Sequence, residues 1–160
     1  MELVSYVEAL KIIKSPTRVA LAVVRAKENI YNLITLEWYM RTSIEPPMFA
    51  ISIGHTRYSY ECLQENRFFN LVFPSDEMKN IVKYCGSHSG RDFDKFNILD
   101  INWMPGRLNK LPILDDAVAN FECQITGQIK SGDHTIFVGE VKYVWANADK
   151  ELAIYYPLKD

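Results

Sequence analysis

The sequence predicts a mainly β protein of the α+β class, in which antiparallel strands most economically form a small barrel with two or three short helices. Two observations carry this prediction. Several apolar runs have the length of strands and are bounded by turn residues. Residues 117–130 alternate between apolar and polar side chains, and a second long strand over 134–146 follows the turn Ser131-Gly132-Asp133.

The N-terminal half predicts three strands. Residues 18–25 form a short apolar run, and residues 30–40 are rich in β-branched and aromatic side chains. Asn29 lies in the turn between them and can adopt a left-handed conformation. Pro46-Pro47 then leads into a third strand over 48–53. Because these runs are apolar at successive positions, we expect both faces of the strands to be covered.

Short helices and a fourth strand follow. Ser59 is a candidate N-cap for a helix over residues 59–65. A strand is predicted over 68–73, and a clearer helix over 75–85 begins with acidic residues in its first turn. Gly86 then occupies the C′ position, where a left-handed residue commonly ends a helix.

The alternation over residues 117–130 assigns side chains to the two faces of one strand. The apolar face is predicted to hold Ala117, Ala119, Phe121, Cys123, Ile125 and Ile129, and the polar face Asn120, Glu122, Gln124, Thr126, Gln128 and Lys130. Neither repeats nor linkers interrupt the sequence, so residues 1–160 are expected to form a single domain.

Composition excludes several classes of function. The net charge of −2 and the lack of a basic patch with aromatic residues argue against nucleic-acid binding. The longest apolar runs are too short to span a membrane, and the N-terminal segment does not resemble a signal peptide, so a cytoplasmic location is expected. Three scattered cysteines and three distant histidines predict buried thiols rather than disulfides, and no metal site.

A polar corner over residues 54–59 joins the third strand to the following helix. Gly54 allows close approach to a ligand, and hydroxyl groups, Arg57 and a helix N-terminus favour an anion. A capped turn on the surface is the alternative interpretation.

Two further polar clusters have the same ambiguity. Residues 87–96 could clamp a phosphate or a ribityl chain, or form a solvated loop in which Asp92 caps a short helix. In the turn before the last long strand, His134 could contact a substrate because histidine titrates near neutral pH. Taken alone, the segment is better explained as a hairpin turn in which Asp133 caps the backbone and His134 has no role.

Read in order, these clusters and their neighbours resemble a known family. The blocks that carry the resemblance are Lys14–Arg18, Asn32–Trp38, Glu45–Ile53, Arg57–Ser59, Phe68–Asn70, Ser89–Phe96 (SGRDFDKF), Phe121–Cys123 and Gly132–Glu140 (GDHTIFVGE). They are similar to successive blocks of the flavin reductase-like family, the FMN-binding split-barrel group that includes flavoredoxins. The resemblance runs from about residue 11 to residue 145.

The resemblance implies a split β-barrel with Greek-key character that forms a homodimer and holds FMN, with FAD as the alternative, near the subunit interface. Its implied flavin-binding residues are Thr35, Leu36, Glu37, Trp38, Ser52, Ile53, Gly54, Arg57, Tyr58, Ser59, Asn70, Ser89, Gly90 and Lys95. His134 is implied as a catalytic residue on the nicotinamide side of the flavin. Flavins carry the hydride and electron chemistry themselves, so no nucleophile or acid–base pair needs to be present.

The implied activity is an NAD(P)H-dependent flavin reductase that passes electrons to an unknown flavin, metal or protein acceptor. A flavoredoxin-type electron-transfer protein without nicotinamide activity is the alternative. Two departures from the family pattern affect the expected properties of the flavin site. Glu37 stands where many relatives have a small residue, and the tail over residues 151–160 lacks the usual glycine-containing ending.

Overall fold

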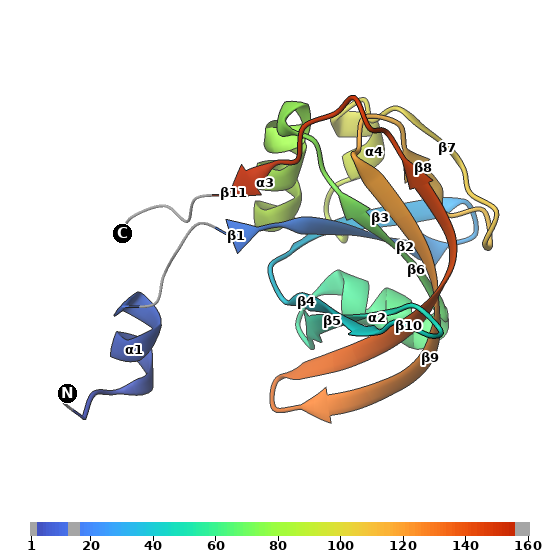
Figure 1. Ribbon diagram of the computed structural model, residues 1–160. Coiled ribbons are helices and arrows are strands. Elements are labelled where there is room, and N and C mark those ends of the chain that lie inside the picture. The colour runs from blue at the N-terminus through green and yellow to red at the C-terminus, as the bar shows by residue number, and fades with distance from the viewer. Residues whose placement is uncertain (1–2, 13–16, 156–160) are drawn as a thin grey trace.

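The computed structural model describes residues 3–12 and 17–155. Its centre is a seven-stranded antiparallel sheet with the strand order β3-β2-β6-β9-β10-β5-β4, and the long strands β9 and β10 curve across the molecule (Figure 1). The strands of this sheet are β2 (Ala20–Lys27), β3 (Ile30–Leu36), β4 (Tyr39–Ser43), β5 (Met48–Gly54), β6 (Phe68–Phe73), β9 (Ala119–Ser131) and β10 (His134–Ala146). The predicted mainly β class is confirmed.

Short elements complete the fold. The helices are α1 (Tyr6–Ile12), α2 (Tyr58–Glu65), the 3-10 helix η1 (Asp76–Met78), α3 (Lys79–Ser87) and α4 (Lys95–Ile98), and two small strand pairs join β1 (Thr17–Arg18) to β11 (Ile154–Tyr155) and β7 (Trp103–Pro105) to β8 (Pro112–Leu114). None of the helices described is long and apolar enough to cross a bilayer. Residues 14–16 of the first family block and 156–160 of the tail lie outside the described residues.

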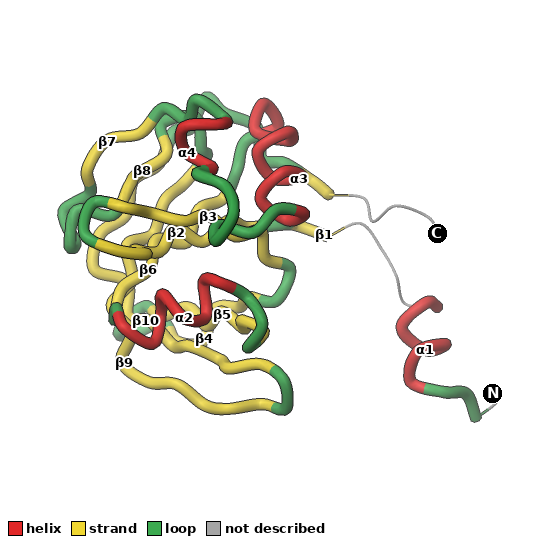
Figure 2. The backbone as a smooth tube through the Cα atoms, turned by 180° about the vertical axis from the view of Figure 1, so that it is seen from behind, coloured by secondary structure: helices red, strands yellow, loops and turns green. Residues whose placement is uncertain are grey.

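Strand β2 is covered on both faces, as predicted. Ala20, Ala22 and Val24 belong to one apolar cluster, which includes side chains of α2. Leu21 and Val23 belong to a second cluster, which includes side chains of α3. The two helices accordingly lie on opposite sides of β2 and β3 (Figure 2).

Several predicted boundaries were wrong. The strand predicted over residues 30–40 divides at Glu37-Trp38 into β3 and β4, and β4 turns to pair with β5. Ser59 does not cap α2 but lies buried in its first turn, and Arg57 is the N-cap residue. Asn29 has the expected left-handed conformation, with φ of 55°.

Two helix ends also differ from the prediction. Gly86 lies inside α3 rather than beyond its end, because the helix continues to Ser87. Asp94, not Asp92, caps α4, and its side chain accepts a hydrogen bond from the Asn97 N–H. This short helix therefore begins after Asp94, because the Asp94 carboxylate accepts a hydrogen bond from a free N–H group of the first turn.

The predicted faces of β9 hold only in part. Cys123 and Ile125 are buried as expected, but Ile129 is 62% exposed. In the pairing with β10, Val138 lies opposite Gly127 and Gly139 opposite Ile125, so one residue of β9 is left unpaired in a bulge. A bulge moves every later side chain to the other face, and this places Ile129 outside the core.

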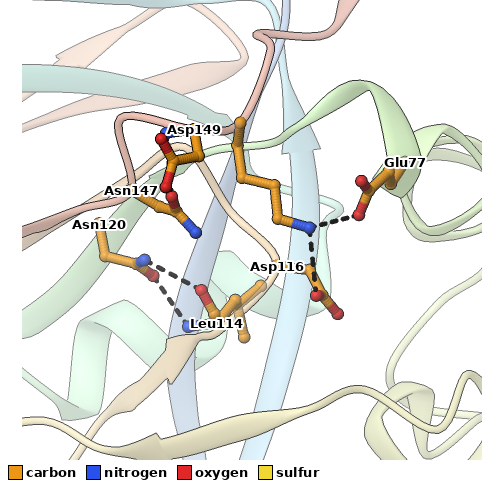
Figure 3. A network of polar contacts seen from close by, with 7 residues as sticks. Glu77, Leu114, Asp116, Asn120, Asn147 and Asp149 are labelled. Atoms are coloured by element: carbon orange, nitrogen blue, oxygen red, sulfur yellow. Dashed lines mark hydrogen bonds and ion pairs between the residues drawn. The ribbon is translucent and has the colours of Figure 1, made fainter.

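Two polar residues of β9 are buried against the prediction. Asn120 exchanges hydrogen bonds with the backbone of Leu114 (Figure 3). Lys150 forms ion pairs with Glu77 and Asp116.

Glu122 is fully buried and accepts hydrogen bonds from the backbone N–H groups of Arg107 and Leu108 and from Trp145 Nε1 at 2.7 Å. These donors satisfy a carboxylate that would otherwise be costly to bury. Glu122 therefore anchors the loop between β7 and β8 to the sheet.

Candidate functional site

A polar cleft of about 250 Å³ lies between β3, the N-terminus of α2 and the segment from the end of α3 to α4. Seven of the sequence-predicted flavin-binding residues line it: Thr35, Arg57, Tyr58, Ser59, Ser89, Gly90 and Lys95. The polar corner over residues 54–59 and the cluster over residues 87–96 are thus walls of one cleft, although they lie far apart in the sequence.

The N-terminus of α2 forms one wall. The first backbone N–H groups of a helix have no intrahelical acceptor, and they carry partial positive charge. Arg57 is the N-cap residue in an extended conformation, and its side chain lines the cleft. This arrangement favours an anionic ligand at that wall.

Ser59 and Asn32 meet at the floor of the cleft. Asn32 Nδ2 donates a hydrogen bond of 2.9 Å to Ser59 Oγ, and both residues are buried. Gly90 crosses directly over the amide, because a Cβ atom at Gly90 would lie only 2.1 Å from Asn32 Oδ1. Asn32 was not among the sequence-predicted site residues.

Lys95 is 3% exposed yet lines the cleft. Its Nζ donates to the backbone oxygens of Leu33 at 2.6 Å and Cys85 at 3.3 Å, so it ties β3 to α3. Burial lowers the pKa of Lys95, and the charge of Arg57 acts in the same direction. An ammonium group has three N–H donors, and one remains for a ligand.

Arg91 closes the cleft from outside. Its guanidinium pairs with Glu61 of α2, donates to the backbone oxygen of Thr56 at 3.2 Å and lies 5.5 Å from the centre of the Tyr58 ring. These contacts hold the segment after α3 against the N-terminus of α2. The cleft therefore carries three cationic side chains, of which Arg57 and Lys95 were predicted.

His88 adds an aromatic wall that the prediction did not include. Its ring stacks on Tyr84 with centroids 3.9 Å apart, and Phe93 packs against it edge-on at 5.3 Å. His88 Nδ1 lies 3.2 Å from the Tyr84 carbonyl oxygen and 3.0 Å from Ser87 Oγ. The polar residues around His88 do not predict this stacking, because the stacking depends on the helical turn that brings Tyr84 and His88 together.

A second group of predicted residues lies beside the cleft. The ring of Trp38 packs on that of His134 with centroids 4.6 Å apart, and His134 Nδ1 lies 2.6 Å from Asp133 Oδ1. The hydrogen bond with His134 lowers the pKa of Asp133. A Cβ atom at Gly54 would lie 3.3 Å from His134 Nε2 and 3.7 Å from Arg57 Cγ, so Gly54 joins this pair to the cleft.

The remaining predicted residues occupy other positions. Ser52 donates its N–H to the Trp38 carbonyl oxygen at 2.9 Å, and Glu37 is exposed to solvent. Leu36 and Ile53 are buried in the apolar core, where only their backbone groups could reach a ligand.

Asn70 is not brought to the cleft. It is fully buried and donates to the Pro112 carbonyl oxygen at 2.7 Å and to Asn120 Oδ1 at 3.1 Å. Its side chain therefore joins β6 to β8 and β9. Elsewhere, the described residues hold no cluster of three or more histidine, cysteine, aspartate or glutamate side chains suited to a metal ion.

The fold and the cleft define a small, mainly β protein with a polar, cationic cleft beside its sheet. Residues 13–159 match the model of the flavin reductase like domain. The chain belongs to the flavin reductase-like family, as the sequence blocks predicted.

Three similar proteins illustrate the relationship. The chain is 31% identical to an uncharacterized protein of Archaeoglobus fulgidus over 71% of this chain and 64% of that protein. It is 28% identical to an NADH-dependent FAD reductase of Streptomyces globisporus over 68% of this chain and 59% of that protein. The aligned parts thus span less than two thirds of these relatives.

The third is a solved structure, an FMN-binding protein from Thermus thermophilus with bound p-hydroxybenzaldehyde. It superposes with a TM-score of 0.82 at 28% identity, covering 99% of this chain and 89% of that one. The two proteins are therefore similar in fold over nearly the whole of this chain and are also similar in sequence.

Proposed function

We propose that this protein is an FMN-binding oxidoreductase that accepts a hydride from NAD(P)H and passes the electrons to a flavin, metal or protein acceptor. The observation that carries the proposal is the cleft, in which Arg57, Arg91 and Lys95 surround hydroxyl groups at the start of a helix. This set of donors suits a phosphorylated polyol, which is the chain that FMN presents.

The residues present fit such a ligand. Arg57 and the first turn of α2 would hold the phosphate, and Ser59 and Ser89 would add hydroxyl donors. Gly90 has no side chain to obstruct the approach to the floor of the cleft.

Bound flavin supplies the hydride and electron transfer, and the protein positions it. The remaining N–H of Lys95 would place positive charge beside the flavin, where negative charge is stabilised by a preorganised donor. Trp38 and His134 would offer an aromatic surface for the nicotinamide on the open side. Two relatives named as an NADH-dependent FAD reductase and an FMN-binding protein support this proposal.

Spectroscopy tests the proposal directly. The purified protein is titrated with FMN and FAD, and the loaded protein is mixed with NADH or NADPH under argon. Binding of FMN in the low micromolar range or tighter, followed by bleaching of the visible flavin band with one nicotinamide, is the expected result.

Two other outcomes would overturn part or all of it. Bleaching only by a reduced ferredoxin-like protein would instead assign a flavoredoxin-type electron carrier. A protein that binds neither flavin would end the proposal altogether.

The proposal includes a homodimer with the flavin near the interface. Edge strand β4 and the residue after it expose Met40 and Ile44, a surface that a second copy of the chain would bury. Sedimentation at micromolar concentration should give twice the 18.5 kDa of one chain. A monomer at all concentrations would contradict this part of the proposal and leave flavin binding to be judged separately.

A further inference from the structure

The segment between α3 and α4, residues 88–94, forms one wall of the cleft without belonging to a helix or a strand. Its two ends are fixed, since the His88 N–H donates to the Tyr84 carbonyl oxygen at 3.0 Å and Lys95 follows directly with its bonds to β3 and α3. Residues 91–94 in between are exposed. The position of such a segment depends on a few specific contacts.

Arg91 supplies the contacts of this segment with the opposite wall. Among the described residues, every hydrogen bond between residues 88–94 and residues 54–61 is made by the Arg91 side chain. Its Nη1 donates to the Thr56 carbonyl oxygen at 3.2 Å, and its Nη2 pairs with the Glu61 carboxylate. The guanidinium thus bridges the two walls of the cleft.

Glu61 takes part in this bridge without reaching the cleft. It lies in the first turn of α2 and is not one of the residues that line the cleft. The side chains of Arg91 and Glu61 are 41% and 55% exposed. Ion pairs of this kind are weak and are screened by salt, so the pair can open while both walls stay folded.

We propose that the Arg91–Glu61 pair is a latch that sets how long a bound flavin stays in the cleft. With the pair closed, residues 88–94 lie against the N-terminus of α2 and retain the ligand. With the pair open, this segment can move away from α2 and the flavin can leave. Glu61 is then a positioning residue that acts through Arg91. The inference rests on the proposed flavin binding and concerns the rate of release.

The sign of the effect of Glu61→Gln distinguishes the latch from a simple effect of charge. Glu61 places negative charge near the start of the helix that would hold the phosphate. Its removal should therefore slow the release of FMN if charge alone acted, because like charges repel. The latch predicts the opposite result. We expect release to become about twofold to fivefold faster, which corresponds to the contribution of an exposed ion pair.

The rate of release is measured from the recovery of flavin fluorescence after rapid dilution of the FMN-loaded protein, which needs no turnover. Glu65→Gln removes an exposed carboxylate one turn further along α2 and is the matched control, with a rate equal to that of the wild type. The difference between Glu61→Gln and the wild type should shrink as NaCl is raised from about 0.05 to 1 M. Slower or unchanged release in Glu61→Gln would overturn the latch.

A double-mutant cycle shows whether Glu61 acts through Arg91. Arg91→Ala removes the whole bridge, so the addition of Glu61→Gln to it should change the release rate by less than about 1.5-fold. Arg91→Gln, which also cannot form the ion pair, replaces Arg91→Ala if that variant binds FMN too weakly. Equal acceleration by Glu61→Gln in both backgrounds would contradict the latch. Both side chains are exposed, and thermal unfolding without flavin checks that each variant is folded.

These outcomes separate the inference from the proposed function. A wild-type protein that binds FMN, with Glu61→Gln releasing it at the same rate, would leave the proposed function standing and overturn the inference. A wild-type protein that binds no flavin would overturn both.

Discussion

The indole ring of Trp38 lies on the imidazole of His134, with 4.6 Å between the ring centroids. Trp38 precedes edge strand β4 and is 60% exposed, whereas His134 begins β10 and pairs with Gly54 of β5. The contact therefore fixes the histidine ring from the solvent side, while Asp133 fixes its Nδ1.

Removal of the Trp38 ring should weaken the binding of the nicotinamide more than the binding of the flavin. In Trp38→Ala we expect the KM for the pyridine nucleotide to rise about three- to tenfold, because an aromatic pair contributes about 0.5–1.5 kcal/mol. Steady-state kinetics with FMN-loaded protein measures this, and Trp38→Phe should restore most of the loss. A change in FMN affinity of the same size would place Trp38 against the flavin instead.

Arg57 should be a determinant of FMN affinity. We expect Arg57→Ala to weaken FMN binding by about 1–3 kcal/mol, the range for hydrogen bonds to charged groups. Isothermal titration calorimetry measures the loss, which should shrink for riboflavin. Lys27→Ala removes an exposed cation at the end of β2 and is the control for net charge. Equal affinities for the two variants would exclude Arg57 from the site.

A methyl group at position 90 should weaken FMN binding through Asn32. The three atoms that it would meet all belong to the Asn32 amide, at 2.1, 2.5 and 3.1 Å. We therefore expect Gly90→Ala to lower FMN affinity about tenfold or more in the wild-type background, and much less in an Asn32→Ala background. Fluorescence titration of the four proteins measures the coupling, and an identical loss in both backgrounds would contradict it.

Glu122 should be important for stability and not for the site. Glu122→Gln places an amide against the N–H donors of Arg107, Leu108 and Trp145, so we expect the free energy of unfolding to fall by about 2–4 kcal/mol. Urea denaturation measures this. Glu28→Gln, at an exposed residue, is the control and should stay within about 0.5 kcal/mol of wild type.

Alkaline pH should destabilise the protein partly through Cys62. Burial raises the pKa of Cys62 from 9.0 to about 11, so between these pH values the folded chain holds a proton that the unfolded chain has lost. The contribution of the Cys62 thiol to the free energy of unfolding is fully present below pH 9 and is lost as the pH rises through 11.

The difference between wild type and Cys62→Ala isolates this contribution. The free energy of unfolding of the variant should fall less steeply between pH 9 and 11, by up to about 1.4 kcal/mol per pH unit. The comparison is needed because burial lowers the pKa of Lys95, which gives the opposite trend. Parallel curves from urea denaturation would show that the Cys62 thiol titrates alike in both states.

The main elements could be predicted from the sequence because each is encoded locally. The runs over β2, β5 and β6 are apolar at successive positions, and the turn before His134 has its left-handed glycine, with φ of 60° at Gly132. Burial of Glu122 could not be predicted in this way, since its partners come from a distant loop and from Trp145. The exposure of Ile129 depends on a bulge that the alternation does not reveal.

The site was predictable to a similar extent. Arg57, Ser59 and Lys95 lie in segments whose polar composition stands out, and the structure brings them to one cleft. Asn32 was missed because it looks like one polar residue in an apolar strand, and its contact with Gly90 joins residues far apart in the sequence. Asn70 has the same appearance in β6 and also has an unpaired buried oxygen, yet its Nδ2 donates to groups of the core and the residue does not line the cleft.

The separation of the two apolar clusters by β2 has a consequence for the width of the cleft. One wall belongs to α2, which packs on the first cluster, and the other follows α3, which packs on the second. Strand β3 lies between the two walls and sets the distance between them. A cavity made in one cluster would therefore move only the wall that packs on that cluster. Substitutions on either side of the sheet would then change the affinity for a ligand without replacing a residue that contacts it.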